Sequence, residues 1–264
     1  MSGLPFYQVD AFARRAFEGN PAAVMPLDEW LPDAAMQSIA AENNLSETAF
    51  LVRSDRDDAD YDLRWFTPKV EVDLCGHATL ASAHVVIDGE RVRFATRSGI
   101  LAVTRGEGSL LKLDLPAYRV EPATEPGLLA ALGLPAGTPT YLGRGGNGAA
   151  IALLADEAAV RSVAPDFAAL RTIDRLVIVT APGEATDIAS RVFAAYHGID
   201  EDPVTGSAHA ALVPFWADRL GRTRFTALQA SRRGGHLDCE VAGDRVILGG
   251  HCITTIEGRF LLSA

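Results

Sequence analysis

Alternation of apolar and polar residues along the chain predicts many short β-strands, and two other stretches have the spacing of helices. Residues 31–43 open with Pro32 and Asp33 and then carry apolar side chains on one face, which predicts an amphipathic helix. The predicted strands are residues 6–12, 48–52, 61–66, 91–96, 101–104 and 110–115 in the first half, and 222–227, 237–241 and 245–248 in the second.

Two further segments, residues 76–87 and 207–216, are apolar on nearly every side. A helix without a polar face must be buried all round, so each is expected to be enclosed by a sheet. Pro214 lies inside the second segment and predicts a kink or an early end. The pattern therefore predicts an α+β protein in which curved, mostly antiparallel sheets wrap around central buried helices.

The chain also repeats itself. Residues 19–24 resemble 146–151, residues 75–78 align with 205–208, 91–94 with 222–225, and 99–101 with 235–237. The matches occur in the same order and their offsets grow slowly from 127 to 136, about half the length of the chain. A single duplication therefore predicts two homologous half-barrel domains, 1–118 and 127–264, joined by a proline-rich acidic linker at 116–126. The final strand is left open to cross back to the first domain, and the site is expected between the halves.

Charge and cysteine usage narrow the function classes. Acidic residues outnumber basic ones by 34 to 24, giving a net charge of −10, which disfavours nucleic acids and anionic membranes as partners. No apolar run approaches the roughly 20 residues of a membrane span, and the N-terminus shows no signal peptide. The three cysteines lie far apart, which is typical of a reducing cytoplasm, and no paired spacing indicates a metal site.

The segment 43–50 contributes the first candidate for catalysis, Glu47. This carboxylate lies between the end of a predicted helix and the start of an apolar strand, and desolvation there could raise its pKa. It could then act as a general base and return the same proton as an acid. The alternative interpretation is an ordinary solvated glutamate at the start of a strand.

Cys75, Gly76 and His77 open the first buried helix. The glycine would let backbone N–H groups approach an anion closely, and the positive end of the helix dipole would attract a carboxylate or phosphate. His77 could donate to the substrate, and a helix N-terminus would lower the pKa of the Cys75 thiol. The alternative is that Cys75 is a small buried apolar residue and His77 a capping side chain.

The third segment, residues 200–209, opens the second buried helix at Gly206 and Ser207. The duplication predicts that both helix starts point at one cleft and share one anionic group. The carboxylate of Asp202 would repel a bound anion and is therefore not expected to bind one. We hypothesise instead that Asp202 takes part in proton transfer. Asp200 and Glu201 are interpreted as a solvated acidic turn.

Taken together, these segments resemble the phenazine-biosynthesis PhzF-like family, which has the diaminopimelate-epimerase-like fold. The resemblance covers residues 19 to 235 in the family's order. The matching segments are residues 19–24, 44–50, 75–79, 201–208 and 229–235.

The resemblance implies an isomerase that needs no cofactor, works as a homodimer and acts on a small carboxylic acid, with cyclic unsaturated acids among the candidates. It implies that Glu47 is the proton shuttle and that His77 and Asp202 line the site as catalytic partners. The residues expected to bind substrate are Ser46, Cys75, Gly76, Thr205, Gly206 and Ser207.

Two alternatives remain open. Epimerases and racemases of this fold use two cysteines, one at each helix start, whereas this chain has Cys75 at the first and Thr205 at the second. An amino-acid racemase would therefore have to use Cys75 against Glu47 or Asp202. The other alternative is a protein that binds a small acid without catalysis.

Overall fold

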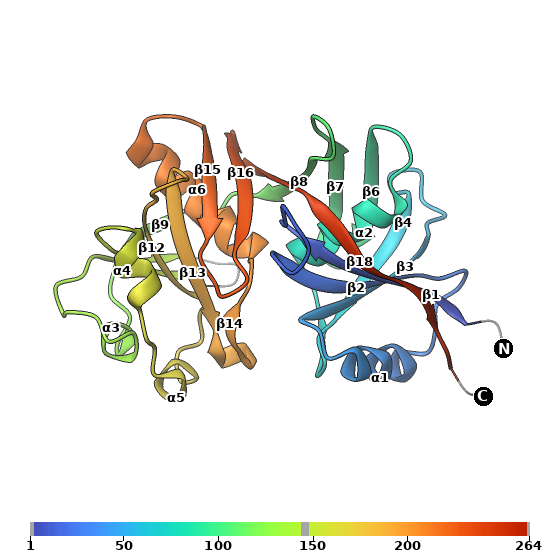
Figure 1. The fold of residues 1–264 in the computed structure, drawn as a ribbon, viewed down its shortest axis with the longest axis horizontal. Helices are drawn as coiled ribbons and strands as arrows, with labels where there is room; N and C mark the ends of the chain where they lie inside the picture. The colour runs from blue at the N-terminus through green and yellow to red at the C-terminus, as the bar shows by residue number, and fades with distance from the viewer. Residues whose placement is uncertain (1–2, 144–147, 263–264) are drawn as a thin grey trace. The chain divides into compact units, whose positions relative to one another are not determined.

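The computed structural model describes residues 3–143 and 148–262, which form two units. Unit 1 comprises Met1–Asp114 and Gly249–Ala264, and unit 2 comprises Leu115–Leu248 (Figure 1). The predicted domains, 1–118 and 127–264, differ from these units chiefly at the C-terminus. There the last strand, β18 (Cys252–Phe260), pairs antiparallel with β1 (Leu4–Ala11) and so belongs to unit 1.

Unit 1 is a mixed sheet that curves around one helix, α2 (Gly76–Val86), which contacts β1, β18 and the two strands after β1 (Figure 1). A second helix, α1 (Asp33–Asn43), packs on the opposite face. The sheet runs from β18 through β1, β2 (Asn20–Pro26), β3 (Glu47–Arg53), β4 (Tyr61–Phe66), β6 (Arg91–Thr96) and β7 (Gly99–Arg105) to β8 (Leu111–Pro116), with β5 (Glu71–Val72) beside the end of β4.

Helices on both faces explain why β3 is buried along almost its whole length. Phe50 and Val52 belong to the apolar cluster that includes Met36 of α1. Because side chains alternate between the faces of a strand, Glu47 and Leu51 face the other way, toward α2. The strand thus directs Glu47 to the side of the sheet that holds the buried helix.

Unit 2 repeats this layout around α6 (Gly206–Leu220). The pairings β2–β3 and β4–β6 are parallel in unit 1, and β11–β12 and β13–β15 are the parallel pairs at matching places in unit 2. Residues 144–147 lie outside the described residues, so the repeat of residues 19–24 can be followed only from Gly148 onward. The strands of unit 2 are β9 (Val120–Pro122), β10 (Thr140–Gly143), β11 (Ala150–Leu153), β12 (Val177–Pro182), β13 (Ile188–Ala194), β14 (Ile199–Asp202), β15 (Arg224–Gln229), β16 (Gly235–Ala242) and β17 (Arg245–Gly250).

Short helices replace α1 in unit 2. They contribute Leu128, Val160 and Leu170 to an apolar cluster with Val177 and Val179 of β12, so β12 is buried on both faces as β3 is. These helices are α3 (Leu128–Ala131), α4 (Glu157–Ser162) and α5 (Phe167–Leu170), and a 3-10 turn, η1 (Ala195–His197), follows β13.

Two local predictions were wrong in part. α6 does not end early at Pro214 but continues to Leu220. The carbonyl of Ala210, which loses its helical donor to the proline, accepts instead from the backbone N–H of Tyr118 at 2.9 Å, so no buried acceptor is left open. The predicted linker 116–126 is not all linker either, because β9 lies within it and pairs with β10.

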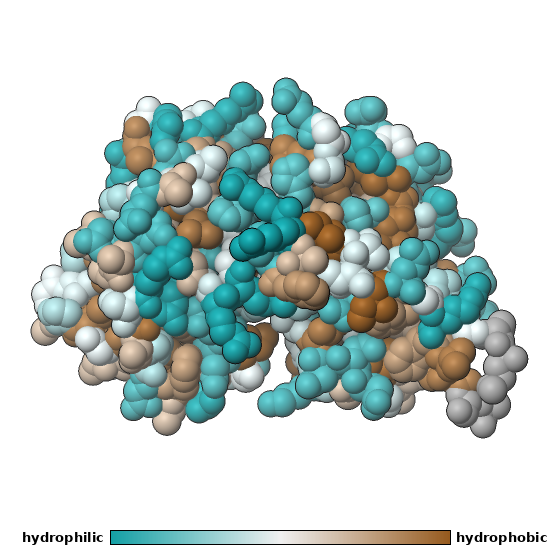
Figure 2. Space-filling model, viewed as in Figure 1, coloured by the Kyte–Doolittle hydropathy of each residue, from teal (hydrophilic) through white to brown (hydrophobic). Residues whose placement is uncertain are grey.

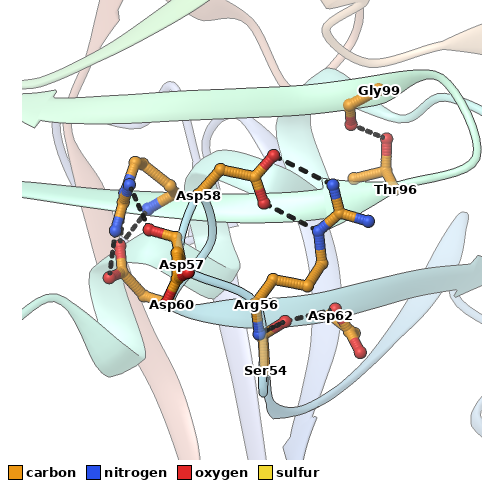
Figure 3. A network of polar contacts seen from close by, with 9 residues as sticks. Ser54, Arg56, Asp57, Asp58, Asp60, Asp62, Thr96 and Gly99 are labelled. Carbon is orange, nitrogen blue, oxygen red and sulfur yellow. Dashed lines mark hydrogen bonds and ion pairs between the residues drawn. The ribbon is translucent and has the colours of Figure 1, made fainter.

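The surface of unit 1 carries a polar network at the β3–β4 connection (Figure 3). Arg56 forms a bidentate pair with Asp58, and Arg93 of β6 contacts Asp60 at 3.1 Å. Such exposed pairs contribute little to stability, but the pair of Arg93 and Asp60 ties the connection to β6. Among the described residues, no helix is long and apolar enough to cross a membrane.

Candidate active site

The first candidate cluster lies in unit 1, where two strand starts and one helix start meet. Asn20 begins β2, Glu47 begins β3, and Cys75 precedes α2 as its N-cap residue. β2 and β3 are parallel neighbours with Ala22 opposite Glu47, so side chains from their first residues reach the same side of the sheet. The structure therefore brings Glu47, Cys75 and His77 together, and adds Asn20.

Glu47 and His77 form the centre of the cluster. Oε2 of Glu47 lies 3.1 Å from Nε2 of His77, and the side chains are only 12% and 5% exposed. The two atoms are close, yet their alignment is not that of a hydrogen bond, and neither has another hydrogen-bond partner among the described residues. A buried carboxylate oxygen and imidazole nitrogen without partners are costly for the protein alone and are available to a bound molecule.

The opposite nitrogen of His77 is held from two sides. Nδ1 lies 3.1 Å from Nδ2 of Asn20 and 3.5 Å from Sγ of Cys75. Ser46 donates its hydroxyl to Oδ1 of Asn20 at 3.2 Å, which leaves the amide nitrogen to donate to Nδ1. When the ring is neutral, this arrangement assigns its proton to Nε2, the nitrogen that faces Glu47.

Burial and the neighbouring groups together set the pKa values of His77 and Cys75. Burial alone lowers the pKa of His77, but its contacts with Cys75 and Glu47 outweigh burial, and the pKa of His77 lies well above its ordinary value. Burial, reinforced by the charge of Glu47, raises the pKa of the Cys75 thiol to about 11. The expectation of a lowered thiol pKa at this helix N-terminus was therefore wrong, because desolvation outweighs the helix dipole.

The start of α2 carries no side-chain cap: its N-cap, Cys75, makes no capping hydrogen bond. The first turn of a helix has backbone N–H groups without intrahelical acceptors, and together with the helix dipole they favour an anion. Gly76 and His77 provide the first of these groups, both within the buried part of the helix. A carboxylate bound there would lie beside the Glu47–His77 pair.

The second candidate cluster lies in unit 2, where β14 leads into α6. Thr205 donates its hydroxyl to Oδ2 of Asp202 and so does not cap the helix, which likewise lacks a side-chain cap. Gln229 lies at the end of β15 and is fully buried. Both the oxygen and the nitrogen of its side-chain amide bond to this segment. Its Oε1 accepts from the backbone N–H of Thr205 at 2.9 Å, and its Nε2 donates to the carbonyl of Asp202 at 2.6 Å.

Gly206 and Ser207 begin α6 at the uncapped end, as Gly76 and His77 begin α2. One turn further on, His209 is fully buried and its Nδ1 lies 2.9 Å from the carbonyl of Thr205, to which it donates. Burial lowers the pKa of His209 to about 4, so the ring is neutral at physiological pH.

The two clusters are related by the duplication but carry different chemistry. In the parallel pairs, Ala23 stands opposite Thr48 and its counterpart Ala150 opposite Val177, so Glu47 corresponds to Leu176. Aligning Cys75 with Thr205 likewise places Asp202 opposite Val72 of the repeat. Each unit thus carries one acidic residue that its duplicate lacks.

The first cluster also has the composition of a metal site. One ligand atom each from Glu47, Cys75 and His77 lies within 4.8 Å of the others. However, Cys75 and Glu47 flank opposite nitrogens of the imidazole ring, so neither ring nitrogen faces both of them. The placement of the three groups around the ring therefore suits proton transfer better than metal ligation.

Sequence reasoning missed Asn20 and Gln229, although both lie in segments that it singled out. The available signal was a polar side chain at the end of an apolar strand. It also misjudged Glu201, predicted as part of a solvated turn: this residue belongs to β14 and pairs with Arg191 at 2.7 Å. Asp200 is half exposed, as expected, and pairs with Arg171 at 2.6 Å.

The chain is similar to known proteins along almost its whole length. The model of the family described as PhzC-PhzF, phenazine biosynthesis-like protein, matches residues 9–258. Two uncharacterized isomerases of Pseudomonas aeruginosa are 52% and 51% identical, each covering 98% of this chain and 99% of the relative. A crystal structure of a phenazine biosynthesis protein of the PhzF family from Enterococcus faecalis superimposes with a TM-score of 0.90 at 47% identity, covering 99% of this chain and 100% of that one.

Proposed function

The chain belongs to the PhzC-PhzF family of phenazine biosynthesis-like proteins, and on that premise we propose that it moves a proton next to the carboxylate of a small acid. Its relatives are named isomerases, and the fold is that of the family's solved structures. The proposal concerns the finer question of which residues carry the proton and how the acid is held.

The observation that carries the proposal is the buried pair of Glu47 and His77. Their facing atoms lie 3.1 Å apart with no hydrogen-bond partner among the residues that the structure describes. A carboxylate in such a place can take a proton from carbon and return it nearby, because it is shielded from water and can act as both base and acid. A bound substrate would occupy the unpaired positions and offset the cost of burying them.

The uncapped start of α2 supplies the second requirement. Removing a proton next to a carboxylate places negative charge on the carboxylate oxygens, and preorganised N–H donors stabilise that charge. We assign carboxylate binding to the backbone of Gly76 and His77, with Ser46 and Cys75 beside it. The reaction so described needs no cofactor, since the proton leaves and returns through Glu47.

In unit 2 we propose a supporting role for Asp202, with Thr205, Gly206 and Ser207 as binding residues. The carboxylate of Asp202 is fixed by the Thr205 hydroxyl, and Gln229 fixes the backbone on both sides of it. Such restraint favours a defined orientation for proton relay or substrate binding.

An amino-acid racemase that uses Cys75 as a base remains the second candidate, supported by the contact of its Sγ with Nδ1 of His77. Two observations weigh against it. The pKa of the thiol is about 11, so little thiolate exists at neutral pH. Its counterpart Thr205 commits its hydroxyl to Asp202, and a threonine hydroxyl is a poor base in any case.

The experiment is a screen of small carboxylic acids in deuterated water, with NMR detection of deuterium next to the carboxylate. An isomerase gives a product whose double bond or proton has moved, whereas a racemase gives the inverted configuration at one carbon. A protein that binds an acid without any exchange would contradict both. The variant Glu47→Gln keeps the size and polarity of the side chain and should reduce exchange by about 10²- to 10⁴-fold.

A further inference from the structure

Trp65 of β4 carries a buried indole N–H that donates to no acceptor among the described residues. Burying such a donor without a partner costs free energy, and the N–H of a buried tryptophan usually finds one. Trp216 follows this rule, because its Nε1 donates to Oγ1 of Thr180 at 3.0 Å. Hydrophilic and hydrophobic residues mix on the face of unit 1 seen in Figure 2, but Trp65 is only 1% exposed. Its N–H is therefore available to a molecule bound within the unit.

Strand pairing places the indole on the same face of the sheet as Glu47. Trp65 stands opposite Ala49, two residues after Glu47 in β3. Phe66, the next residue of β4, packs edge-on against Phe50 in the cluster under α1. Because side chains alternate between the faces of a strand, Trp65 faces the other way, toward α2. Trp65 and Glu47 are then diagonal neighbours at about 7–8 Å, a separation that an aromatic side chain can span.

The other neighbour of Trp65 leads to the start of α2. On that side Trp65 stands opposite Val72 of β5, three residues before the N-cap Cys75. Trp65 therefore lies between the strand that begins at Glu47 and the segment that enters α2. These two elements contribute the buried Glu47–His77 pair and the backbone N–H groups to which we assign the carboxylate.

The duplication relates this part of unit 1 to the second cluster. Arg64 of β4 forms an ion pair with Glu71 of β5 at 2.7 Å. Arg191 of β13 forms the same pair with Glu201 of β14, also at 2.7 Å. β4 and β5 therefore correspond to β13 and β14, residue by residue.

The residues that follow these ion pairs differ between the units. Trp65 stands opposite Val72, and at the matching position of unit 2 Val192 stands opposite Asp202. Each unit thus has one polar side chain at this pair of positions, a carboxylate in unit 2 and an indole in unit 1. Since Asp202 is proposed as a site residue, the repeat gives the indole N–H a matching place in unit 1.

The surroundings define the group that this N–H would meet. An indole nitrogen only donates, so its partner must be an acceptor. The two residues opposite Trp65, Ala49 and Val72, are apolar and accept no hydrogen bond through their side chains. A hydroxyl group would bring a hydrogen that needs an acceptor of its own there, whereas a keto oxygen carries none.

We propose that Trp65 determines substrate specificity by donating its indole N–H to a keto oxygen of the acid whose carboxylate is held at the start of α2. The inference rests on the proposed function, because it concerns the same acid in the same site. It narrows the substrate class from small carboxylic acids to small oxo acids.

Levulinate and pentanoate test the proposal, because these two acids differ by a single keto oxygen. The chain has three tryptophans, and the loss of one indole peak in Trp65→Phe assigns that of Trp65 in a proton–nitrogen NMR spectrum. Levulinate should move this peak downfield, since the N–H gains an acceptor, and pentanoate should leave it nearly in place. Both acids should shift the backbone amides of Gly76 and His77.

Affinity measurements on variants give a second readout. Trp65→Phe keeps a large apolar ring and removes the donor, so it should weaken levulinate binding about tenfold and leave pentanoate binding within about twofold. Trp216→Phe is the matched control, because its N–H is bonded within the protein. It should leave both affinities unchanged and should lower the midpoint of urea unfolding more than Trp65→Phe does.

The outcomes separate this inference from the function on which it rests. If the amides of Gly76 and His77 shift but the Trp65 peak stays in place, or moves equally with both acids, the role of Trp65 is overturned and the proposed function stands. Equal loss of affinity for both acids in Trp65→Phe would also overturn it. If neither acid shifts those amides, carboxylate binding at α2 fails and the inference fails with it.

Discussion

Burial shifts the pKa values of the titratable side chains at the two helix starts in different directions. It raises the pKa of the Cys75 thiol and lowers the pKa of His209, because in each case the charged form is the one that loses water. The pKa of His77 is raised instead, since Cys75 and Glu47 oppose the effect of burial. The sequence placed Glu47, Cys75 and His77 in one site, but it could not give these pKa directions, which depend on contacts between segments far apart.

His209 makes a pH-dependent contribution to stability. The unfolded chain protonates this histidine below its ordinary pKa of 6.5, whereas the folded protein does so only below about 4. Stability is therefore full above pH 6.5, falls as the pH drops toward 4, and changes no further below that. The expected loss from this residue is roughly 3 kcal/mol, from about 1.4 kcal/mol for each pKa unit.

Urea unfolding at pH 7.5 and at pH 4.5 checks this prediction. His209→Asn keeps a donor near the position of Nδ1, which bonds to the Thr205 carbonyl, but does not titrate. The wild type should lose more free energy of unfolding between the two pH values than the variant does. Equal losses would mean that His209 is not the group that titrates.

At the scale of the elements, hydrophobic patterning correctly predicted several of the helices and strands. The predicted helices 31–43 and 76–87 correspond to α1 and α2, and residues 61–66 are the strand β4. The pattern missed β2, β12 and β13, because strands buried along nearly their whole length show no alternation of apolar and polar residues. It also missed β18 and most short elements of unit 2, where strands of three or four residues carry too few positions to show a period. It also misjudged Pro214, since no sequence pattern shows that Tyr118 supplies the missing donor.

Pro214→Ala tests that explanation. In an ordinary helix interior, removing a proline stabilises by about 3 kcal/mol. Here the carbonyl of Ala210 already accepts from Tyr118, so a new N–H at position 214 would compete for an acceptor already in use. We expect a change in the free energy of unfolding below about 1 kcal/mol. A gain near the full value, measured by urea unfolding, would show that the Tyr118 contact does not compensate.

Gln229→Leu tests how strongly the hydrogen bonds of Gln229 stabilise the segment that leads into α6. The leucine retains similar volume but removes the hydrogen bonds to Asp202 and Thr205, leaving buried backbone groups without partners. The expected cost is about 2–4 kcal/mol in the free energy of unfolding. Ser231→Ala is the control, because it removes one bond to the same segment, to the carbonyl of Pro203, and one from the backbone N–H of Gly234 outside it, at about 1 kcal/mol each. Equal costs for the two variants would show that Gln229 is no special restraint.

At the scale of the whole molecule, the duplication was the most informative feature of the sequence. It predicted two units with a buried helix in each, and the structure repeats the same parallel and antiparallel pairings in both. The return of β18 to unit 1 was left open because strand partners far apart in sequence leave no local pattern. Divergence within the duplication matters most for function, since only the first unit carries an acid at the Glu47 position.

The central claim is that Glu47, and not Cys75, carries the proton. The most direct measurement compares solvent deuterium incorporation into one accepted acid by Glu47→Gln and by Cys75→Ala. We predict that Glu47→Gln loses about 10²- to 10⁴-fold in exchange rate while still binding the acid, because only the base is gone. Cys75→Ala should stay within about tenfold of the wild type, since its thiol is protonated and makes no transfer. An active Glu47→Gln beside an inactive Cys75→Ala would contradict the account and assign the base to the thiol.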